Sequence, residues 1–159
     1  MAIQTNKPSI ECIEKVLSEF VKACKKKFGN KLVSIVLFGS HARKTARKTS
    51  DVDLLVIVED LPENFWERDR IAEEISWKFF KEDDIYLEIV LSTKKDIKNA
   101  AKHFNPIFLG ILTGYKIIYD KNDFFEKILK KDILPLVMRS APLFVYGGKK
   151  WDLTKIAKK

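Results

Sequence analysis

The chain has 159 residues, of which 46% are hydrophobic and 33% charged, and its formal net charge is +8. This length corresponds to one domain, which is large enough to bury a core of its own. No apolar run approaches the ~20 residues needed to span a bilayer, and the N-terminal segment lacks the apolar core of a signal peptide. We therefore expect a globular, cytoplasmic protein.

The positive charge limits the class of partner without identifying one. A basic surface favours anionic partners, and nucleotides, RNA and acidic proteins all meet this condition. Solvated helix faces explain lysine runs such as the one at 25–27 equally well. Nucleic-acid binding is therefore compatible with the charge but is not required by it.

Cys12 and Cys24 are the two cysteines, and both fall within the first expected helix. Their spacing on a helix separates them by roughly 18 Å, which is too far for a disulfide. Neither has a CxxC partner or a histidine at metal-ligand spacing. We expect both to be ordinary helix residues.

Hydrophobic periodicity and turn residues predict one α/β domain without repeats or linkers. In chain order the expected elements are a helix over 9–28 capped by Ser9, a strand over 31–38, a strand over 51–58, a turn over 61–64, a helix from about 65 to 80, a strand over 85–91, a helix capped by Ser92 or Thr93 and ending near 103, a short helix from 105 to 114, an edge strand over 115–119 and a helix from about 123 to 138. The first two strands are apolar at nearly every position, as in strands buried on both faces.

Two further expectations concern the helices and the C-terminus. The large apolar side chains of the helix from about 65 to 80 should mostly face inward, namely Trp66, Ile71, Ile75, Trp77, Phe79 and Phe80. Pro135 should bend or end the last helix. Residues 139–159 should form a basic arm, which Trp151 anchors to the domain.

The segment from Gly39 to Asp53 carries the strongest functional signal. Gly39 and Ser40 end an apolar strand, basic residues follow, and two aspartates open the next strand. Glycine at a strand end lets a ligand approach the backbone, and a helix that starts at Ser40 would direct free amides at an anion. Arg43 would lie one turn into that helix, facing either phosphate or solvent. The segment therefore predicts a phosphate-binding turn.

Asp51 and Asp53 are the acidic part of the same segment. Side chains two apart on a strand share a face, about 6.6 Å apart along the chain. Two adjacent carboxylates repel each other unless a cation compensates, and magnesium prefers oxygen ligands that it shares with substrate phosphates. The turn, the basic stretch and the aspartates together predict phosphoryl or nucleotidyl transfer.

The pattern G-S-H-A-R-K…S-D-V-D-L, which begins at Gly39, resembles the signature of the DNA polymerase β-type nucleotidyltransferase superfamily, G-S-x-A-R-G…S-D-x-D-L. The small size is similar to that of its minimal nucleotidyltransferase (MNT) branch, and the resemblance covers roughly residues 30–120. It implies a mixed β-sheet flanked by helices, two magnesium ions, and transfer of a nucleoside monophosphate, commonly AMP from ATP, with release of pyrophosphate. Minimal members are often encoded beside a HEPN-domain protein, and some are antitoxins that adenylylate a HEPN toxin.

The resemblance assigns the metal ligands to three carboxylates: Asp51, Asp53 and Glu88. Glu88 stands for the third carboxylate, usually an aspartate on a later strand, and is the best-placed general base. A charged residue inside an apolar strand is costly unless it is paired or bound to metal, which favours a functional role for Glu88. A salt bridge to one of the many lysines is the alternative.

Gly39, Ser40, Arg43 and Lys44 are the expected phosphate ligands. Lys44 departs from the family pattern, which has glycine there; it would tighten the turn and add a cation that faces phosphate. His41 occupies a position that the family leaves variable, so we assign it no catalytic role.

These observations lead to one functional expectation and two alternatives. We expect a magnesium-dependent transfer of AMP from ATP to a hydroxyl acceptor, on a partner such as a HEPN-domain toxin, by a nucleotidyltransferase domain over 1–138 and a basic arm over 139–159. The chain could instead be an antitoxin-like binding module that neutralises a HEPN partner without catalysis. A basic nucleic-acid-binding protein is the second alternative, although no nucleic-acid-binding motif is recognisable.

Overall fold

The computed structural model describes residues 10–47, 49–103, 105–140, 143–146 and 149–152. Its centre is a mixed four-stranded sheet in the order β3-β2-β1-β4. The strands are β1 (Leu32–Phe38), β2 (Val52–Val58), β3 (Leu87–Thr93) and β4 (Tyr115–Asp120). β1 runs antiparallel to both β2 and β4, whereas β2 and β3 are parallel. The first three strands along the chain are thus neighbours in one sheet.

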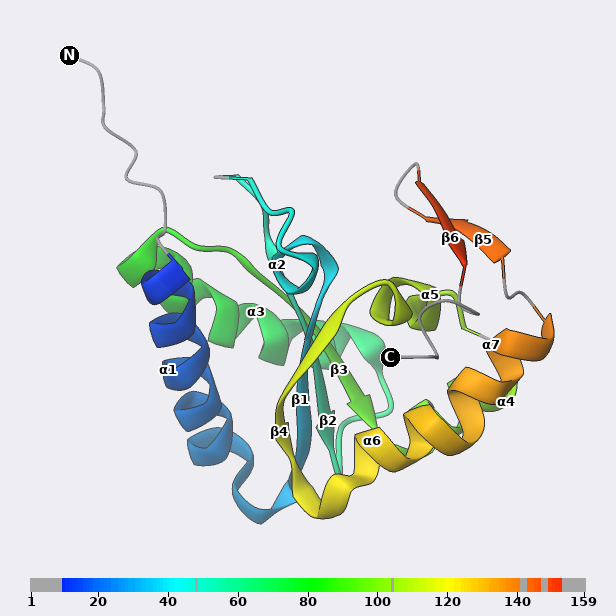
Figure 1. Ribbon diagram of the computed structural model, residues 1–159. Coiled ribbons are helices and arrows are strands. Elements are labelled where there is room, and N and C mark those ends of the chain that lie inside the picture. Colours follow the sequence, from blue (N-terminus) through cyan, green and yellow to red (C-terminus); the bar gives the residue numbers. More distant parts are fainter. Residues whose placement is uncertain (1–9, 48, 104, 141–142, 147–148, 153–159) are drawn as a thin grey trace.

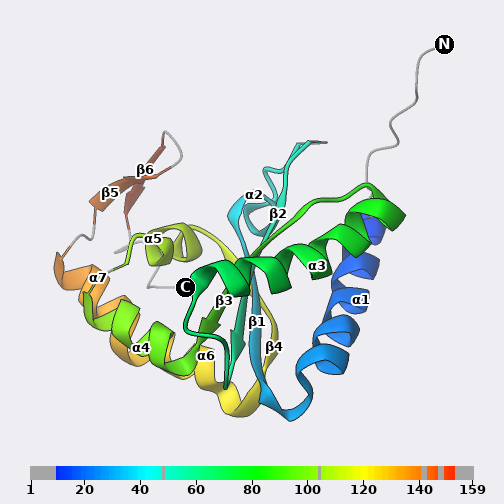
Figure 2. The same cartoon turned by 180° about the vertical axis from the view of Figure 1, so that it is seen from behind.

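Helices cover both faces of this sheet (Figures 1 and 2). α1 (Ile10–Phe28) and α3 (Phe65–Asp83) pack on one face, where Phe20 and Phe79 meet edge to face. On the other face lie α4 (Lys94–His103), α5 (Ile107–Leu112), α6 (Phe124–Ile128) and α7 (Leu134–Ser140). All seven residues of β1 are buried between these layers, which explains its continuous apolar sequence.

α3 corrects the expected orientation of its aromatic side chains. The buried positions of the helix include Ala72, Ile75 and Phe79, at helical spacings of three and four. Trp66 and Trp77 lie off this stripe and are 81% and 59% exposed. The prediction of an inward orientation was wrong for these tryptophans and for the partly exposed Phe80, because a count of apolar residues does not show which helical face they occupy.

β3 begins two residues later than predicted. α3 continues to Asp83, and Asp84 ends it in a left-handed conformation with φ 55°, so Ile85 lies in the connection before the strand. Glu88 is therefore the second residue of β3 rather than a central one, and its side chain is exposed. The expected cost of burying its charge does not apply.

The last helical region is continuous but irregular. A 3-10 turn over Lys121–Asp123 leads into α6, and a π-helical stretch over Leu129–Ile133 joins α6 to α7. Pro135 lies in the first turn of α7. Because proline has no N–H to donate, the backbone hydrogen-bond pattern changes before it. The chain then remains helical to Ser140. Pro135 thus marks an irregularity and does not end the helix.

The predicted C-terminal arm contains a hairpin of β5 (Leu143–Tyr146) and β6 (Lys149–Asp152), in which Phe144 is paired with Trp151. Phe144 also packs on the core between the sheet and α4 to α7. The division into a domain over 1–138 and an arm over 139–159 remains a prediction, and the Ser9 cap lies outside the described residues.

Cys24 lies in α1 and is buried in the core, as expected of an ordinary helix residue, and burial raises the pKa of its thiol to about 12. Cys12 lies within α1. Among the described helices, none combines the length and apolar character required to cross a membrane.

Candidate active site

The Gly-Ser turn lies where β1 gives way to the short helix α2 (Gly39–Arg43). Gly39 has φ +74°, a conformation that L side chains rarely adopt, and a Cβ built there would come within 3.0 Å of the carboxyl carbon of Asp53. The antiparallel pairing of Phe38 with Asp53 brings these residues together. Glycine at this position therefore makes room for a carboxylate of the chain itself, where the sequence suggested room for a ligand.

Asp53 and Glu88 occupy the same level on neighbouring parallel strands. The register of β2 and β3 pairs them directly, and the two side chains share a hydrogen bond when Asp53 is protonated, because two carboxylates have no donor between them. Burial, this hydrogen bond and the charges of Glu88 and Asp51 raise the pKa of Asp53 to about 6, while the charge of Arg43 acts in the opposite direction. Asp51 is exposed and immediately precedes β2. The structure thus pairs Asp53 with Glu88 and places Asp51 close enough to act on Asp53 through its charge.

The site fits magnesium by its chemistry, although the ligands are not grouped around one point. Within the described part of the chain, no three Asp, Glu, His or Cys side chains form a set that could hold a metal ion. Asp53 nevertheless experiences two like charges, which a divalent cation would offset, and every donor is a carboxylate oxygen, as magnesium prefers. Asp51 and Glu88 are exposed, so rotation of their side chains could bring oxygens towards such an ion.

Arg43 is held in place by the connection between α5 and β4. Its Nη1 donates a hydrogen bond of 3.2 Å to Thr113 Oγ1, and Thr113 in turn donates one of 2.6 Å to the carbonyl oxygen of Gly110. A Cβ on Gly114 would come within 2.6 Å of Arg43 Cγ, so only glycine leaves space for the arginine stem. Sequence reasoning missed Thr113 and Gly114, because only the pairing of β1 with β4 brings them to the motif.

His41 has a structural contact within the motif. Its Nε2 lies 3.2 Å from the backbone oxygen of Ser50, the residue before Asp51, so the histidine links α2 to the start of β2. This contact could not be predicted from the sequence, since the family pattern leaves the position variable. His41 therefore helps to place Asp51.

The two remaining motif residues differ in exposure. Ser40 is half-buried in the first turn of α2, whereas Lys44 is exposed and follows the helix. Lys44 has φ 61° and ψ 30°, and its N–H donates to the oxygen of Ser40. This left-handed conformation explains why glycine suits the position in the family pattern. Whether Ser40 and Lys44 contact phosphate remains a prediction.

Comparison with known proteins agrees with this geometry. Residues 17–112 match the family described as nucleotidyltransferase domain. The chain belongs to this family. It is 40% identical over 144 residues to the Methanocaldococcus jannaschii protein named "Putative protein adenylyltransferase MJ1305", covering 91% of this chain and 96% of that protein. It is accordingly a nucleotidyltransferase, as the motif indicated.

Solved structures share the fold at low sequence identity. A toxin–antitoxin structure with AMP-PNP is 21% identical with a TM-score of 0.53, over 77% of this chain and 89% of that chain. The tri-AMPylated Shewanella oneidensis HEPN toxin in complex with MNT antitoxin gives 18% identity and a TM-score of 0.50, over 80% and 90% of the two chains. These likenesses confirm the mixed sheet flanked by helices.

Proposed function

We propose that this nucleotidyltransferase moves AMP from ATP to a hydroxyl group on a partner protein, with a HEPN-domain protein as the expected partner. The observation that carries the proposal is the pairing of Asp53 with Glu88 across β2 and β3, beside the Gly39 turn. The name of the archaeal relative supports AMP and a protein acceptor, and the AMPylated HEPN toxin among the structural neighbours supports the partner.

The carboxylates supply the proton chemistry. The acceptor oxygen attacks the α-phosphorus of ATP, the bond from that phosphorus to the bridging oxygen breaks, and pyrophosphate leaves with the electron pair. Glu88 is exposed and can accept the hydroxyl proton, which then passes to solvent. Two magnesium ions, held by Asp51, Asp53 and Glu88, would stabilise the negative charge on the transferring phosphate and on the leaving group.

The turn after β1 positions the leaving group. Ser40, the backbone amide of Gly39 and the Arg43 guanidinium would hold the β- and γ-phosphates, and Lys44 would add a further cation. Arg43 is fixed by Thr113 and Gly114, so its charge is placed before the substrate arrives. The fixed position of Arg43 supports the proposal that this turn binds the leaving phosphates.

Labelled ATP tests this function directly. The chain, purified together with its HEPN-domain partner, is incubated with magnesium and ATP labelled on either the α- or the γ-phosphate. Transfer of AMP predicts that the partner acquires α-label and no γ-label, and that a chelator abolishes labelling. Acquisition of γ-label would indicate a kinase, and an unlabelled partner that stays tightly bound would favour the non-catalytic antitoxin alternative.

A further inference from the structure

A groove of about 830 Å³ runs beside β3 from Tyr86 to Ser92 and includes the candidate catalytic carboxylate Glu88 near one end. β3 is the outer strand of the sheet, and in the described part of the chain no strand pairs with its far edge (Figure 2). α3 supplies one wall of the groove, while α4 and the start of α5 supply the other. The groove therefore combines a free sheet edge with access to the site of chemistry.

The backbone of β3 can accept another strand at this edge. The N–H of Val52 donates to the oxygen of Tyr86, so alternation turns the N–H and C=O groups of Glu88 and Val90 towards β2. The corresponding groups of Leu87, Ile89 and Leu91 point outward. Ser76 Oγ already donates to the oxygen of Leu87 at 2.7 Å, which leaves Ile89 and Leu91 as the outward pairing positions.

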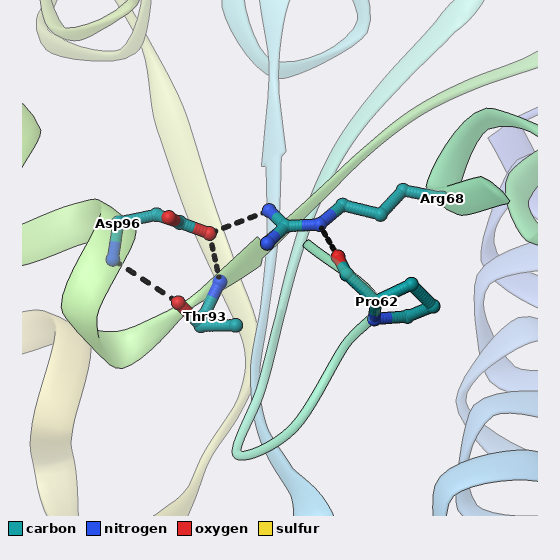
Figure 3. A network of polar contacts seen from close by, with 4 residues as sticks. All are labelled: Pro62, Arg68, Thr93 and Asp96. Atoms are coloured by element: carbon teal, nitrogen blue, oxygen red, sulfur yellow. Dashed lines mark hydrogen bonds and ion pairs between the residues drawn. The ribbon is translucent and has the colours of Figure 1, made fainter. Parts of the chain in front are cut away.

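The charge of the groove is opposite to that of the whole molecule. Asp69 and Glu73 are exposed on the α3 wall, and Glu88 is exposed at the end of the groove. The buried cation of the groove, Arg68, is neutralised by Asp96 through a contact of 2.6 Å that links the two walls (Figure 3). A chain with a net charge of +8 thus presents an acidic groove, which repels RNA and attracts a basic partner.

Exposed aromatic side chains continue the groove outward. Tyr86 and Phe65 line it and are 48% and 68% exposed. Tyr86 also borders an apolar hollow of about 540 Å³ that includes Trp77 and Phe80, whose rings stack at 5.7 Å. Large aromatics exposed in this way are typical of protein-binding surfaces.

We propose that the free edge of β3 binds the acceptor protein, whose extended, basic segment pairs with the backbone of Ile89 and Leu91 and presents its hydroxyl residue to Glu88. This inference rests on the proposed AMP transfer. From Glu88 to Ser92 the strand spans about 13 Å, which accommodates about five residues of the added segment. Backbone pairing supplies affinity, and Asp69 and Glu73 select lysine or arginine beside the reacting hydroxyl.

Binding of synthetic peptides tests the groove independently of catalysis. The probe is a fluorescein-labelled nine-residue peptide that alternates lysine and valine around a central tyrosine. Of two comparison peptides, one has glutamate in place of lysine, and the other is methylated on alternate backbone nitrogens. Fluorescence anisotropy should show binding of the lysine peptide and roughly tenfold weaker binding of each comparison peptide. Equal affinity for the glutamate or the methylated peptide would overturn the proposal.

Matched charge reversals locate the binding surface. Asp69→Lys with Glu73→Lys should weaken binding of the lysine peptide roughly tenfold. Glu63→Lys with Glu82→Lys makes the same charge change at exposed positions outside the groove and should leave it unchanged. Circular dichroism checks that both variants fold. Equal effects of the two pairs of substitutions would contradict the proposal. Displacement of the peptide by a 20-nucleotide RNA would also contradict it, as would a dimer of this chain that dissociates when the peptide binds.

Peptide binding in the groove and AMP transfer to the partner can be measured separately. AMP transfer to the partner without discrimination among the peptides would reject the groove and leave the proposed function intact. Selective binding of the lysine peptide without AMP transfer to the partner would reject the proposed function and leave the groove as a docking surface.

Discussion

The environment of Asp53 disfavours the charged form of its side chain. This is expected of a site that binds a cation. Burial and two neighbouring carboxylates raise its pKa from 3.8 to about 6. Between these values the folded chain holds more protons than the unfolded chain, so the free energy of unfolding falls as the pH rises from about 4 to 6. Above pH 6 Asp53 carries a negative charge that Arg43 offsets only in part.

Asp53→Asn should therefore stabilise the chain while removing activity. The melting temperature of the parent minus that of the variant should decrease as the pH rises from 4 to 7, because the variant lacks the carboxyl group that loses its proton. Magnesium should stabilise the parent at pH 7.5 and have little effect on the variant. Parallel melting curves across this pH range would contradict the like-charge environment of Asp53.

Gly39 offers a second test at the same scale, with Gly29 as its matched control. Both glycines have positive φ, of 74° and 56°, but a Cβ on Gly29 would meet nothing within 4 Å. Alanine at Gly29 should cost about 1 kcal/mol in the free energy of unfolding, owing to the left-handed conformation, and alanine at Gly39 should cost more because its Cβ also clashes with Asp53. Only Gly39→Ala should also displace Asp53 and reduce magnesium-dependent ATP affinity in calorimetry; equal ATP affinity in both variants would remove Gly39 from the site.

At the scale of elements, the sequence predicted the strands and the motif well because their signals are local. The apolar runs before Gly39 and after Asp51 lie within single strands, and the turn between them has characteristic residues. Three other features have no local signal in the sequence: the outward face of α3, the hydrogen bond that anchors Arg43, and the close approach of Asp53 to Gly39. Each depends on which elements pack together, and Thr113 is 70 residues from Arg43.

The link between α3 and α4 is one such tertiary feature (Figure 3). Arg68 is 7% exposed and donates to Asp96 and to the backbone oxygen of Pro62. Asp96 also accepts from the N–H of Thr93, while its own N–H donates to Thr93 Oγ1, which confirms Thr93 as the predicted cap of α4. Burial tends to raise the pKa of Asp96, but the hydrogen bonds and the charge of Arg68 outweigh it and hold that pKa below 3.8.

Asp96→Asn should destabilise the chain by roughly 2 kcal/mol at pH 7, because the buried Arg68 loses a charge-assisted hydrogen bond to its anionic partner. The stabilisation by Asp96 is present above its ordinary pKa and is lost as the pH falls through the lowered value. Asp60→Asn is the matched control, since the Asp60–Lys31 pair is 3.4 Å apart with side chains 74% and 62% exposed. Urea unfolding compares the two, and equal losses would contradict a special role for the buried link.

At the scale of the whole molecule, net charge and local charge give different information. The +8 total suggested anionic partners, whereas the groove at Glu88 is acidic and only the folded chain brings Asp69, Glu73 and Glu88 together. Composition therefore describes the average surface and not the charge of an individual groove. The nucleic-acid-binding alternative loses its main support at this groove.

The predicted domain boundary can be tested by truncation after Ser140, the end of α7. The family match ends at residue 112, and Leu143 in the hairpin is 69% exposed, so the shortened chain should fold and bind ATP with magnesium. Calorimetric ATP affinity within about threefold of the parent, roughly 0.6 kcal/mol, is the expected result. Loss of ATP binding in a folded truncation would place the arm in the site.

The most direct test of the account compares Glu88→Gln with Asp84→Asn. Glu88→Gln keeps size but cannot take the acceptor proton, so AMP transfer from α-labelled ATP to the partner should be abolished while much of the ATP affinity remains. Asp84 is exposed at the end of α3, and asparagine tolerates its left-handed conformation, so Asp84→Asn should transfer AMP at nearly the parental rate. An active Glu88→Gln beside an inactive Asp84→Asn would contradict the assignment of Glu88 as the third carboxylate.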